Sequence, residues 1–443
     1  MRVIVIGAGT GGLCLAHGLR RAGVEVSVHE RDRTRTGGLQ GYRVGISPSG
    51  SRALSRCLPP ELYRTFLATC ARTPRHFTMY TEKFREVLSL DLVEQPVPED
   101  NERSVSRMTL RQVLLTGLED VTHFDREFTR YDQHADGTVT AYFTDGTTVH
   151  GDVLVAADGT NSAVRRQYLP HARLEDAGIV AVGGKVALTP EIRALLPDRA
   201  VHGISTVFAP GGQFCILHVM EFPWDRSGAV RTGIGGTDAE LLAAWPGLLF
   251  DNTRDYVMWG FSASTDKFPA DIGDRRGEQL RRQVQAMTGD WHPDLRALFA
   301  RTEDDTVFRV NIRTSVPVEP WSPSTVTLLG DAIHTMTPGR GIGANTALRD
   351  AALLTRKLTA VRDGRAELLT AIGEYETRMR EYGYEAVAAS RKQMSGTDPI
   401  HRPVLGRAVL AGMRTGMRLV NHVPALKRRM AAAEQSFRTA EDE

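Results

Sequence analysis

An acidic residue and a histidine stand three positions apart in the stretch "GDAIHTMTPGRGIGAN", residues 330–345. Asp331 and His334 are residue types that transfer protons, and His334 could serve as a general base. The same stretch has a glycine-rich turn and Asn345 at the start of a helical pattern. Backbone N–H groups at a helix N-terminus bind phosphate and other negative charge. The residues therefore allow acid–base catalysis by side chains, or the binding of a ligand that itself performs the chemistry.

A second candidate ligand site opens the chain. The β-branched run at residues 2–6 leads into "GAGTGG" and a helical pattern, and a second apolar run ends at Glu30. This order of strand, glycine turn, helix, strand and acid is the context of the dinucleotide fingerprint. Gly7 would make the tight turn, Gly9 would let the backbone approach a pyrophosphate, and Gly12 would let helix and strand pack closely. Glu30 would accept hydrogen bonds from a ribose diol.

Asp158 ends a third apolar run. Residues 153–157 read as a buried strand, and Ser162 and Arg165 follow the Asp158-Gly159 pair. In open α/β sheets, ligands bind outside the carboxyl ends of the strands, so Asp158 is a candidate ligand contact. An Asp-Gly turn followed by a capped helix accounts for the same residues. Both interpretations stay open at this point.

The scaffold for these stretches is predicted from apolar runs that alternate with helical patterns. Strand-like runs with glycines, from about residue 176 to 270, predict an intervening β-rich domain. The predicted fold class is α/β, with a Rossmann-like nucleotide domain interleaved with a β-sheet-rich substrate domain, followed by C-terminal helices. The predicted boundaries are 1–75, 106–175 and 276–390 for the nucleotide domain, 76–105 and 176–275 for the substrate domain, and 391–443 for the helical segment.

Composition narrows the class of protein. A chain of 443 residues predicts two or three domains, and its formal net charge of +2 gives no reason to expect nucleic acid as a partner. No apolar run reaches the length of about 18 residues that predicts a membrane-spanning helix, and the N-terminus lacks the pattern of a signal peptide. The four cysteines have no metal-like spacing, so we expect reduced thiols, no metal site and a cytoplasmic location.

Together the three motifs resemble the single-component FAD-dependent monooxygenases of the para-hydroxybenzoate hydroxylase type, a family of aromatic hydroxylases and epoxidases. The third motif follows the family pattern GDAAHxxxPxxGxGxN, with Ile333 in place of an alanine, and the resemblance spans about residues 1 to 390. The cofactor-binding residues that the resemblance implies are Gly7, Gly9, Thr10, Gly12, Glu30, Arg31, Arg107, Arg111, Asp158, Asp331, Gly341, Gly343, Ala344 and Asn345.

The resemblance implies FAD as the cofactor and NAD(P)H and O₂ as co-substrates. In the family, NAD(P)H reduces FAD, O₂ adds at flavin C4a, and the hydroperoxide transfers one oxygen atom to the substrate. The expected function is hydroxylation or epoxidation of an apolar or aromatic specialised metabolite. A second hypothesis is a redox-neutral cyclase of the same fold that holds FAD as a structural cofactor. The sequence does not distinguish NADH from NADPH.

The residues nearest to the substrate are expected in the third motif. His334 is interpreted as structural, with a general base as the alternative, because the family carries histidine here across many substrates. Pro338 would shape the substrate-facing side of the flavin. Arg340 stands where the family often has a small or aromatic residue, and would either meet an anionic substrate or face solvent. These three are candidates near the flavin, and no side chain is assigned as the catalytic group.

The C-terminal segment is basic and apolar. From Arg402 to Arg429 it has seven Lys or Arg residues and no Asp or Glu. It is interpreted mainly as a helical pair that covers the substrate domain, and alternatively as an amphipathic surface for a membrane or a carrier protein. The expected partners are a small-molecule substrate and O₂, and a homodimer is a further hypothesis.

Overall fold

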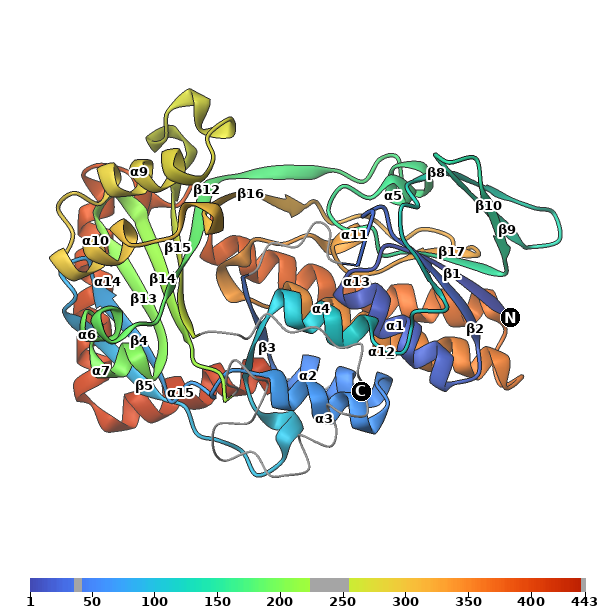
Figure 1. Cartoon of the computed structure of the whole chain (residues 1–443), viewed down its shortest axis with the longest axis horizontal. Helices are drawn as coiled ribbons and strands as arrows, with labels where there is room; N and C mark the ends of the chain where they lie inside the picture. The colour runs from blue at the N-terminus through green and yellow to red at the C-terminus, as the bar shows by residue number, and fades with distance from the viewer. Residues whose placement is uncertain (36–41, 224–254, 440–443) are drawn as a thin grey trace.

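Two β-sheets organise the chain (Figure 1). The computed structural model describes residues 1–35, 42–223 and 255–439. The first sheet has the strand order β17-β11-β1-β2-β7, and all its neighbouring strands are parallel. Its strands are β1 (Arg2–Ile6), β2 (Glu25–His29), β7 (Thr122–His123), β11 (Val153–Ala156) and β17 (Val326–Leu328). This parallel sheet confirms the Rossmann-like part of the predicted fold.

Helices cover the parallel sheet and carry the motifs. They include α1 (Thr10–Arg21), α12 (Gly343–Arg362) and α13 (Leu368–Gln393). Strands β1 (from Val3), β11 and β17 are mostly apolar and are buried, as a parallel sheet between helices requires. Helices α1 and α12 lie close together, since a Cβ atom at Gly18 would be 2.4 Å from Thr355 Oγ1. The helix that ends the third motif is thus held directly against the helix of the first.

The second sheet has seven strands in the order β16-β12-β15-β14-β13-β4-β5. They are β4 (His76–Thr81), β5 (Glu86–Asp91), β12 (Leu174–Ala187), β13 (Gly203–Ala209), β14 (Gln213–Met220), β15 (Tyr256–Ser264) and β16 (Phe308–Ser315). The long strands β12 and β16 run antiparallel to each other between the two parts of the molecule (Figure 1). The expected β-rich domain is present, and β12 and β16 connect it to the parallel sheet.

Helices α9 (Gly277–Met287) and α10 (Pro293–Ala300) belong to this second domain. Leu280 and Leu298 are buried in the same core cluster as Trp259 of β15. Trp259 Nε1 also donates a hydrogen bond to Thr302 Oγ1 at 2.8 Å. The structure therefore corrects the predicted boundary at residue 276. A helical pattern shows that a face is buried, but it does not show which sheet the helix covers.

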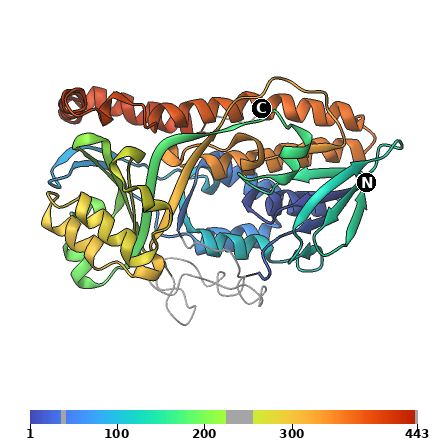
Figure 2. The ribbon, with the colours of Figure 1, turned by 90° about the horizontal axis from the view of Figure 1, so that it is seen from above.

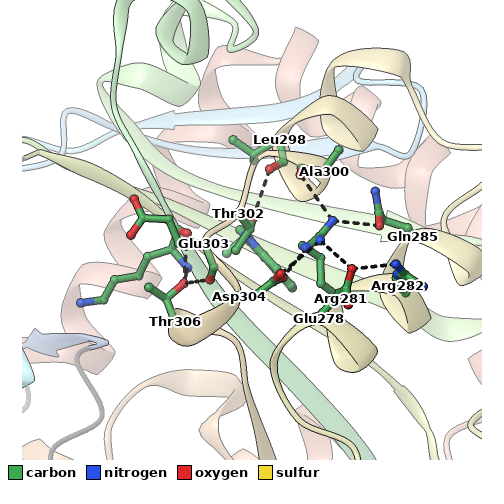
Figure 3. A network of polar contacts seen from close by, with 12 residues as sticks. Glu278, Arg281, Arg282, Gln285, Leu298, Ala300, Thr302, Glu303, Asp304 and Thr306 are labelled. Atoms are coloured by element: carbon green, nitrogen blue, oxygen red, sulfur yellow. Dashed lines mark hydrogen bonds and ion pairs between the residues drawn. The ribbon is translucent and has the colours of Figure 1, made fainter.

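Polar contacts fix the turn after α10 on the same sheet (Figure 3). The guanidinium of Arg281 donates two hydrogen bonds to the Asp304 carboxylate, at 2.5 and 3.3 Å. Thr306 Oγ1 accepts from the backbone N–H of Lys185 at 3.1 Å and donates to the carbonyl of Lys185 at 3.2 Å. These contacts join the turn to α9 and to β12, so the segment from residue 277 to β16 packs as part of the substrate domain.

Smaller elements complete the described fold. A two-stranded sheet pairs β3 (Arg43–Ile46) with β6 (Arg103–Ser106), and a three-stranded sheet contains β8 (Phe128–Gln133), β9 (Val139–Phe143) and β10 (Thr148–Gly151). The short helices are α2 (Pro48–Cys57), α3 (Pro60–Thr69), α4 (Arg107–Leu115), α5 (Ala163–Tyr168), α6 (Pro190–Ala194), α7 (Asp198–Val201) and α11 (Asp331–His334). The 3₁₀ turns are η1 (Pro98–Asp100), η2 (Pro210–Gly212), η3 (Thr265–Lys267), η4 (Ala270–Gly273), η5 (Asp304–Thr306), η6 (Pro338–Arg340) and η7 (Pro399–His401).

The C-terminal helices α14 (Leu405–His422) and α15 (Pro424–Thr439) run along one side of the molecule (Figure 2). Met417 and Met430 pack against the buried side chains of β4 and β5. Arg414 forms an ion pair with Glu82, and Asn421 Oδ1 accepts a hydrogen bond from the backbone N–H of Ser89 at 3.1 Å. The helical pair thus covers part of the substrate sheet, as the main interpretation of the sequence expected.

Candidate cofactor site

The three sequence motifs meet at one edge of the parallel sheet. Gly7 follows β1, Glu30 follows β2, Asp158 lies just beyond β11, and Asp331 lies just beyond β17. Strand β1 pairs with β2 on one side and with β11 on the other, and β11 pairs with β17. Because these strands are parallel, their carboxyl ends lie side by side. This is the place where open α/β sheets bind ligands.

Of the three fingerprint glycines Gly7, Gly9 and Gly12, the fold requires the first and the third but not Gly9. Gly7 has a φ of +108°, and a Cβ there would lie 2.4 Å from the Ala157 carbonyl oxygen. A Cβ at Gly12 would lie 2.3 Å from the carbonyl oxygen of Gly7. Gly9 has an ordinary φ of −81°, and a Cβ there would meet only the Ala157 oxygen, at 4.0 Å. The open space over Gly9 fits a closely approaching phosphate group.

The acid at the end of β2 is held by backbone and by an arginine. Glu30 is 9% exposed and accepts hydrogen bonds from the backbone N–H of Ala8 at 2.7 Å and of Asp32 at 3.0 Å. Arg111 of α4 lies 3.7 Å from Glu30 and 3.0 Å from Asp32. Its Nε also donates to the Ala8 carbonyl at 3.3 Å. The predicted residues Glu30 and Arg111 therefore meet at the glycine turn, and each carboxylate oxygen of Glu30 can still accept from a ribose hydroxyl.

The neighbouring predicted residues differ in exposure. Thr10 is half-buried as the first residue of α1, so its N–H belongs to the helix N-terminus beside Gly9. Arg31 directly follows Glu30, and its side chain is exposed. The structure therefore brings Thr10 to the glycine turn through its backbone, whereas the side chain of Arg31 lies at the surface.

The two carboxylate oxygens of Asp158 have different surroundings. Oδ2 accepts from the backbone N–H groups of Ala163 at 2.7 Å and of Val164 at 3.3 Å, at the start of α5. Oδ1 is buried and has no hydrogen-bond partner among the described residues. Burial raises the pKa of this carboxyl above its ordinary value. One oxygen thus caps a helix, which is the plainer of the two sequence interpretations, and the other can accept from a bound molecule.

Arg165 connects the second motif to the third. Its guanidinium is 6% exposed and donates to the carbonyl of Ala332 at 2.7 Å and to that of Thr160 at 2.9 Å. A buried arginine bound to two backbone carbonyls fixes the distance between the segments that follow β11 and β17. Sequence analysis placed Arg165 in the second motif but gave it no such role.

Asp331 and His334 point to different environments. Asp331 is exposed, whereas His334 is fully buried. His334 Nε2 lies 2.6 Å from Asp350 Oδ2, which also accepts from the backbone N–H of Gly330 at 2.7 Å. Burial alone would lower the pKa of His334, but the Asp350 carboxylate outweighs it and the pKa is raised.

The Asp350 carboxylate is the centre of this buried network. Its second oxygen accepts from the hydroxyl of Tyr382 at 2.6 Å. Asp350 therefore holds the N–H before Asp331, the His334 ring and a residue of α13 together. This geometry supports a structural role for His334. The pairing of His334 with Asp350 spans sixteen positions and has no local signal in the sequence.

The side chain of Asn345 is occupied by the protein itself. Its Oδ1 accepts from the backbone N–H of Ser47 at 2.8 Å, and its Nδ2 donates to the carbonyls of Gly45 at 3.0 Å and Gly341 at 3.2 Å. A Cβ at Gly50 would lie 2.1 Å from that Oδ1, so α2 approaches closely. Asn345 thus ties the start of α12 to β3 and α2, and only its backbone remains available to a ligand.

The glycine turn before α12 is the open part of the third motif. Gly341 is exposed, has a φ of +65°, and would have no atom within 4 Å of an added Cβ. Gly343 and Ala344, the first residues of α12, are half-buried. Pro338 is exposed and Arg340 is half-buried in the turn η6. The N–H groups of the first turn of α12 can therefore face a bound ring, as the sequence predicts.

Arg107 lies where the two domains meet. Its backbone N–H donates to the Tyr42 carbonyl at 2.8 Å, and its guanidinium lies 5.0 Å from the centre of the Tyr42 ring. Tyr42 in turn stacks on Phe308 of the substrate sheet, with ring centres 5.7 Å apart. The backbone N–H of Arg43 approaches Met258 Sδ at 3.3 Å. Tyr42 and Arg43 form an interdomain contact that sequence analysis missed, because an isolated loop residue carries no pattern.

Comparison with known proteins agrees with this geometry. The family model "FAD binding domain" matches residues 1–390. The chain belongs to this family. A Photorhabdus luminescens protein assigned as an FAD containing monooxygenase has a crystal structure that is 34% identical in sequence, with a TM-score of 0.76 over 89% of this chain and 98% of that one. FAD as the cofactor and the single-component FAD-dependent monooxygenase family are thereby confirmed.

Two further relatives differ in length. The dual O-methyltransferase/FAD-dependent monooxygenase CTB3 of Cercospora beticola is 32% identical over 401 residues, and the match covers 85% of this chain but 44% of that protein. The FAD-dependent urate hydroxylase of Klebsiella pneumoniae is 28% identical over 402 residues, 89% of each chain. This FAD-binding chain thus spans less than half the length of the dual-function relatives it matches.

The described residues show neither a metal-binding cluster nor a membrane-spanning helix. They contain no group of three or more His, Cys, Asp or Glu side chains arranged to hold a metal ion. The four cysteines are buried and free. Within the same residues, no helix combines the length and the apolar character that crossing a membrane requires.

Proposed function

We propose that the protein is an FAD-dependent monooxygenase that uses NAD(P)H and O₂ to hydroxylate or epoxidise an apolar or aromatic metabolite. The observation that carries the proposal is the convergence of three motifs at one sheet edge, with the space over Gly9 left open. Bound FAD would supply the redox chemistry, and the chain's own residues would bind it, orient it and shield it from water.

In this proposal, different residues contact different parts of FAD. The N–H groups at the start of α1 face the pyrophosphate beside Gly9, and Glu30 accepts from the adenosine ribose. Asp331 is an exposed carboxylate at the end of β17, where it can accept from hydroxyl groups of the ribitol chain. The first turn of α12, from Gly343, presents N–H groups that stabilise negative charge on the ring. Arg111 holds Glu30 in position.

The substrate side is proposed on the face of the large sheet that turns away from α9 and α10. Ile216 of β14 and Met258 of β15 lie on this face and are half-buried, and a Cβ at Gly260 beside them would lie 3.2 Å from Ile216 Cγ2. His218 is buried on the same face. This face combines apolar side chains with polar ones, among them Thr206 opposite Ile216 and Lys185 opposite Met258, and such a combination suits a largely apolar or aromatic ring. Of the two curated relatives, only the urate hydroxylase is named for its substrate, so the substrate class is drawn from this face and not from the relatives.

The test is turnover with the purified, yellow, FAD-loaded protein. We expect an accepted aromatic compound to increase NAD(P)H oxidation and to acquire one labelled oxygen atom from isotopically labelled O₂. The matched control is the Asp331→Asn protein, which should fold and lose FAD. Conversion of the compound without NAD(P)H or O₂ would instead select a redox-neutral cyclase, and a protein that takes up no FAD would contradict both assignments.

A further inference from the structure

Most of the exposed large apolar side chains lie on the C-terminal helices. In the described part of the chain eight such residues are exposed, and five of them fall between positions 404 and 426. Their exposed fractions are 83% for Val404, 45% for Leu405, 37% for Val409, 59% for Leu419 and 41% for Leu426. Single exposed apolar residues need no explanation, but a cluster of this kind marks a contact surface.

The exposed apolar residues of α14 adjoin the side that covers the sheet and continue it outward. Leu405, Val409 and Leu419 are four and ten positions apart, which places them on one stripe of a helix with about 3.6 residues per turn. Met417 and Val420, by contrast, pack against the buried side chains of β4 and β5. The apolar arc of α14 is therefore wider than the part that packs on the sheet, and its outer part is exposed.

Positive charge accompanies this stripe. Residues 402–429 carry seven cations and no acid, and the whole chain has a formal net charge of +2, so the rest of the chain is at −5. Arg414 is turned inward to Glu82. The other six cations are exposed, apart from Lys427, which is half-buried. They are Arg402, Arg407, Arg418, Lys427, Arg428 and Arg429. The basic character is thus local to the segment that also exposes the apolar side chains.

We propose that this C-terminal surface, made of these five apolar residues and six cations, docks on an anionic lipid bilayer. Basic side chains attract acidic headgroups, and the apolar stripe enters the headgroup boundary. A second copy fits less well, because two copies meeting here would bring twelve cations together with no acid from this segment. Nucleic acid would neutralise the cations but would leave the apolar side chains exposed to water. Since no described helix can span a membrane, the contact is peripheral.

The proposal is tested by sedimenting the full-length, FAD-loaded protein with vesicles. The vesicles are phosphatidylcholine alone, or phosphatidylcholine with about one third phosphatidylglycerol. We expect binding to the anionic vesicles only, and weaker binding as salt rises. Leu419→Glu should reduce the bound fraction about tenfold, because it removes apolar contact and adds a negative charge. The double change Arg407→Glu and Arg418→Glu should do the same or more.

The matched control is Leu369→Glu on α13, a substitution at another exposed leucine (48% exposed) outside the surface. It should bind like the unchanged protein, and all variants should keep the same thermal midpoint. Absence of binding to anionic vesicles at low salt would overturn the proposal, as would equal loss in Leu369→Glu. A dimer in solution that Leu419→Glu converts to a monomer would assign the surface to self-association instead, and so would also overturn it.

Discussion

Glu376 gives the sharpest test of how the parallel sheet is held. It lies on α13, is 1% exposed, and accepts a hydrogen bond from Thr327 Oγ1 of β17 at 2.8 Å. Its other oxygen is buried without a hydrogen-bond partner in the described chain. Burial raises the pKa of Glu376 from an ordinary 4.5 to about 7. The charged form of Glu376 therefore destabilises the native state. The residue contacts β17, the strand that leads to Asp331.

The sign and size of the effect follow from proton linkage. Between pH 4.5 and 7 the unfolded chain has released the Glu376 proton while the native protein still holds it. The native state binds more protons, so the free energy of unfolding falls as pH rises through this window and then levels off. A pKa difference of about 2.5 units corresponds to about 3 kcal/mol. Replacing Glu376 by Gln keeps an acceptor for Thr327 and removes the charge, so it should recover that amount above pH 7.

The assay is chemical denaturation of the Glu376→Gln protein and the unchanged protein from pH 4.5 to 8. We expect equal stability at the acid end and a growing advantage of the variant, up to about 3 kcal/mol at pH 8. Glu374→Gln is the matched control, because Glu374 is two positions away, 57% exposed and paired with Lys357. It should show no such pH dependence. A variant that is less stable than the unchanged protein at pH 8 would refute the reasoning.

Two further pairs of substitutions separate folding from FAD binding. Gly9→Ala should leave the thermal midpoint unchanged and weaken FAD binding about tenfold or more, measured by flavin fluorescence, because only a ligand needs the space over it. Gly12→Ala should instead cost about 3 kcal/mol of stability, since its Cβ would lie 2.3 Å from a carbonyl oxygen. Asp331→Asn should lower FAD affinity without changing the midpoint. Asp350→Ala should cost about 3–5 kcal/mol, because it leaves three buried partners without their acceptor; an unchanged midpoint would contradict this.

Sequence patterns predicted the cofactor edge well because its signals are local. The turn at Gly7, the acid at Glu30 and the strand ends before Asp158 and Asp331 are each specified within a few residues. Their convergence followed from the rule that parallel strands place their carboxyl ends together. Arg111 was expected at the cofactor only from the family resemblance, and its contact with Glu30 was not predicted, since nothing in the spacing of α4 places it there.

What the sequence did not reveal are the contacts between distant segments. Asn345 bonds to Gly45 and Ser47 some three hundred positions away, and Arg165 reaches the carbonyl of Ala332. The sheet that α9 covers is likewise decided by tertiary packing. An amphipathic pattern shows that one face of a helix is buried, but not against which sheet. The misplaced boundary at residue 276 and the unnoticed clamp of Asn345 have this same cause.

The polar residues of the third motif thus fall into two groups that the sequence alone does not separate. Asp350, the amide of Asn345 and Nε2 of His334 have their hydrogen bonds within the protein, so they fix backbone positions but offer a ligand little, whereas Nδ1 of His334 is buried without a partner in the described chain. Asp331 is exposed, and the turn at Gly341 is open. Since a buried polar group is costly unless paired, the paired residues are explained by the fold itself. Asp331 and the turn at Gly341 are not explained by pairing within the protein, and they lie at the carboxyl edge of the sheet, where a ligand would explain them.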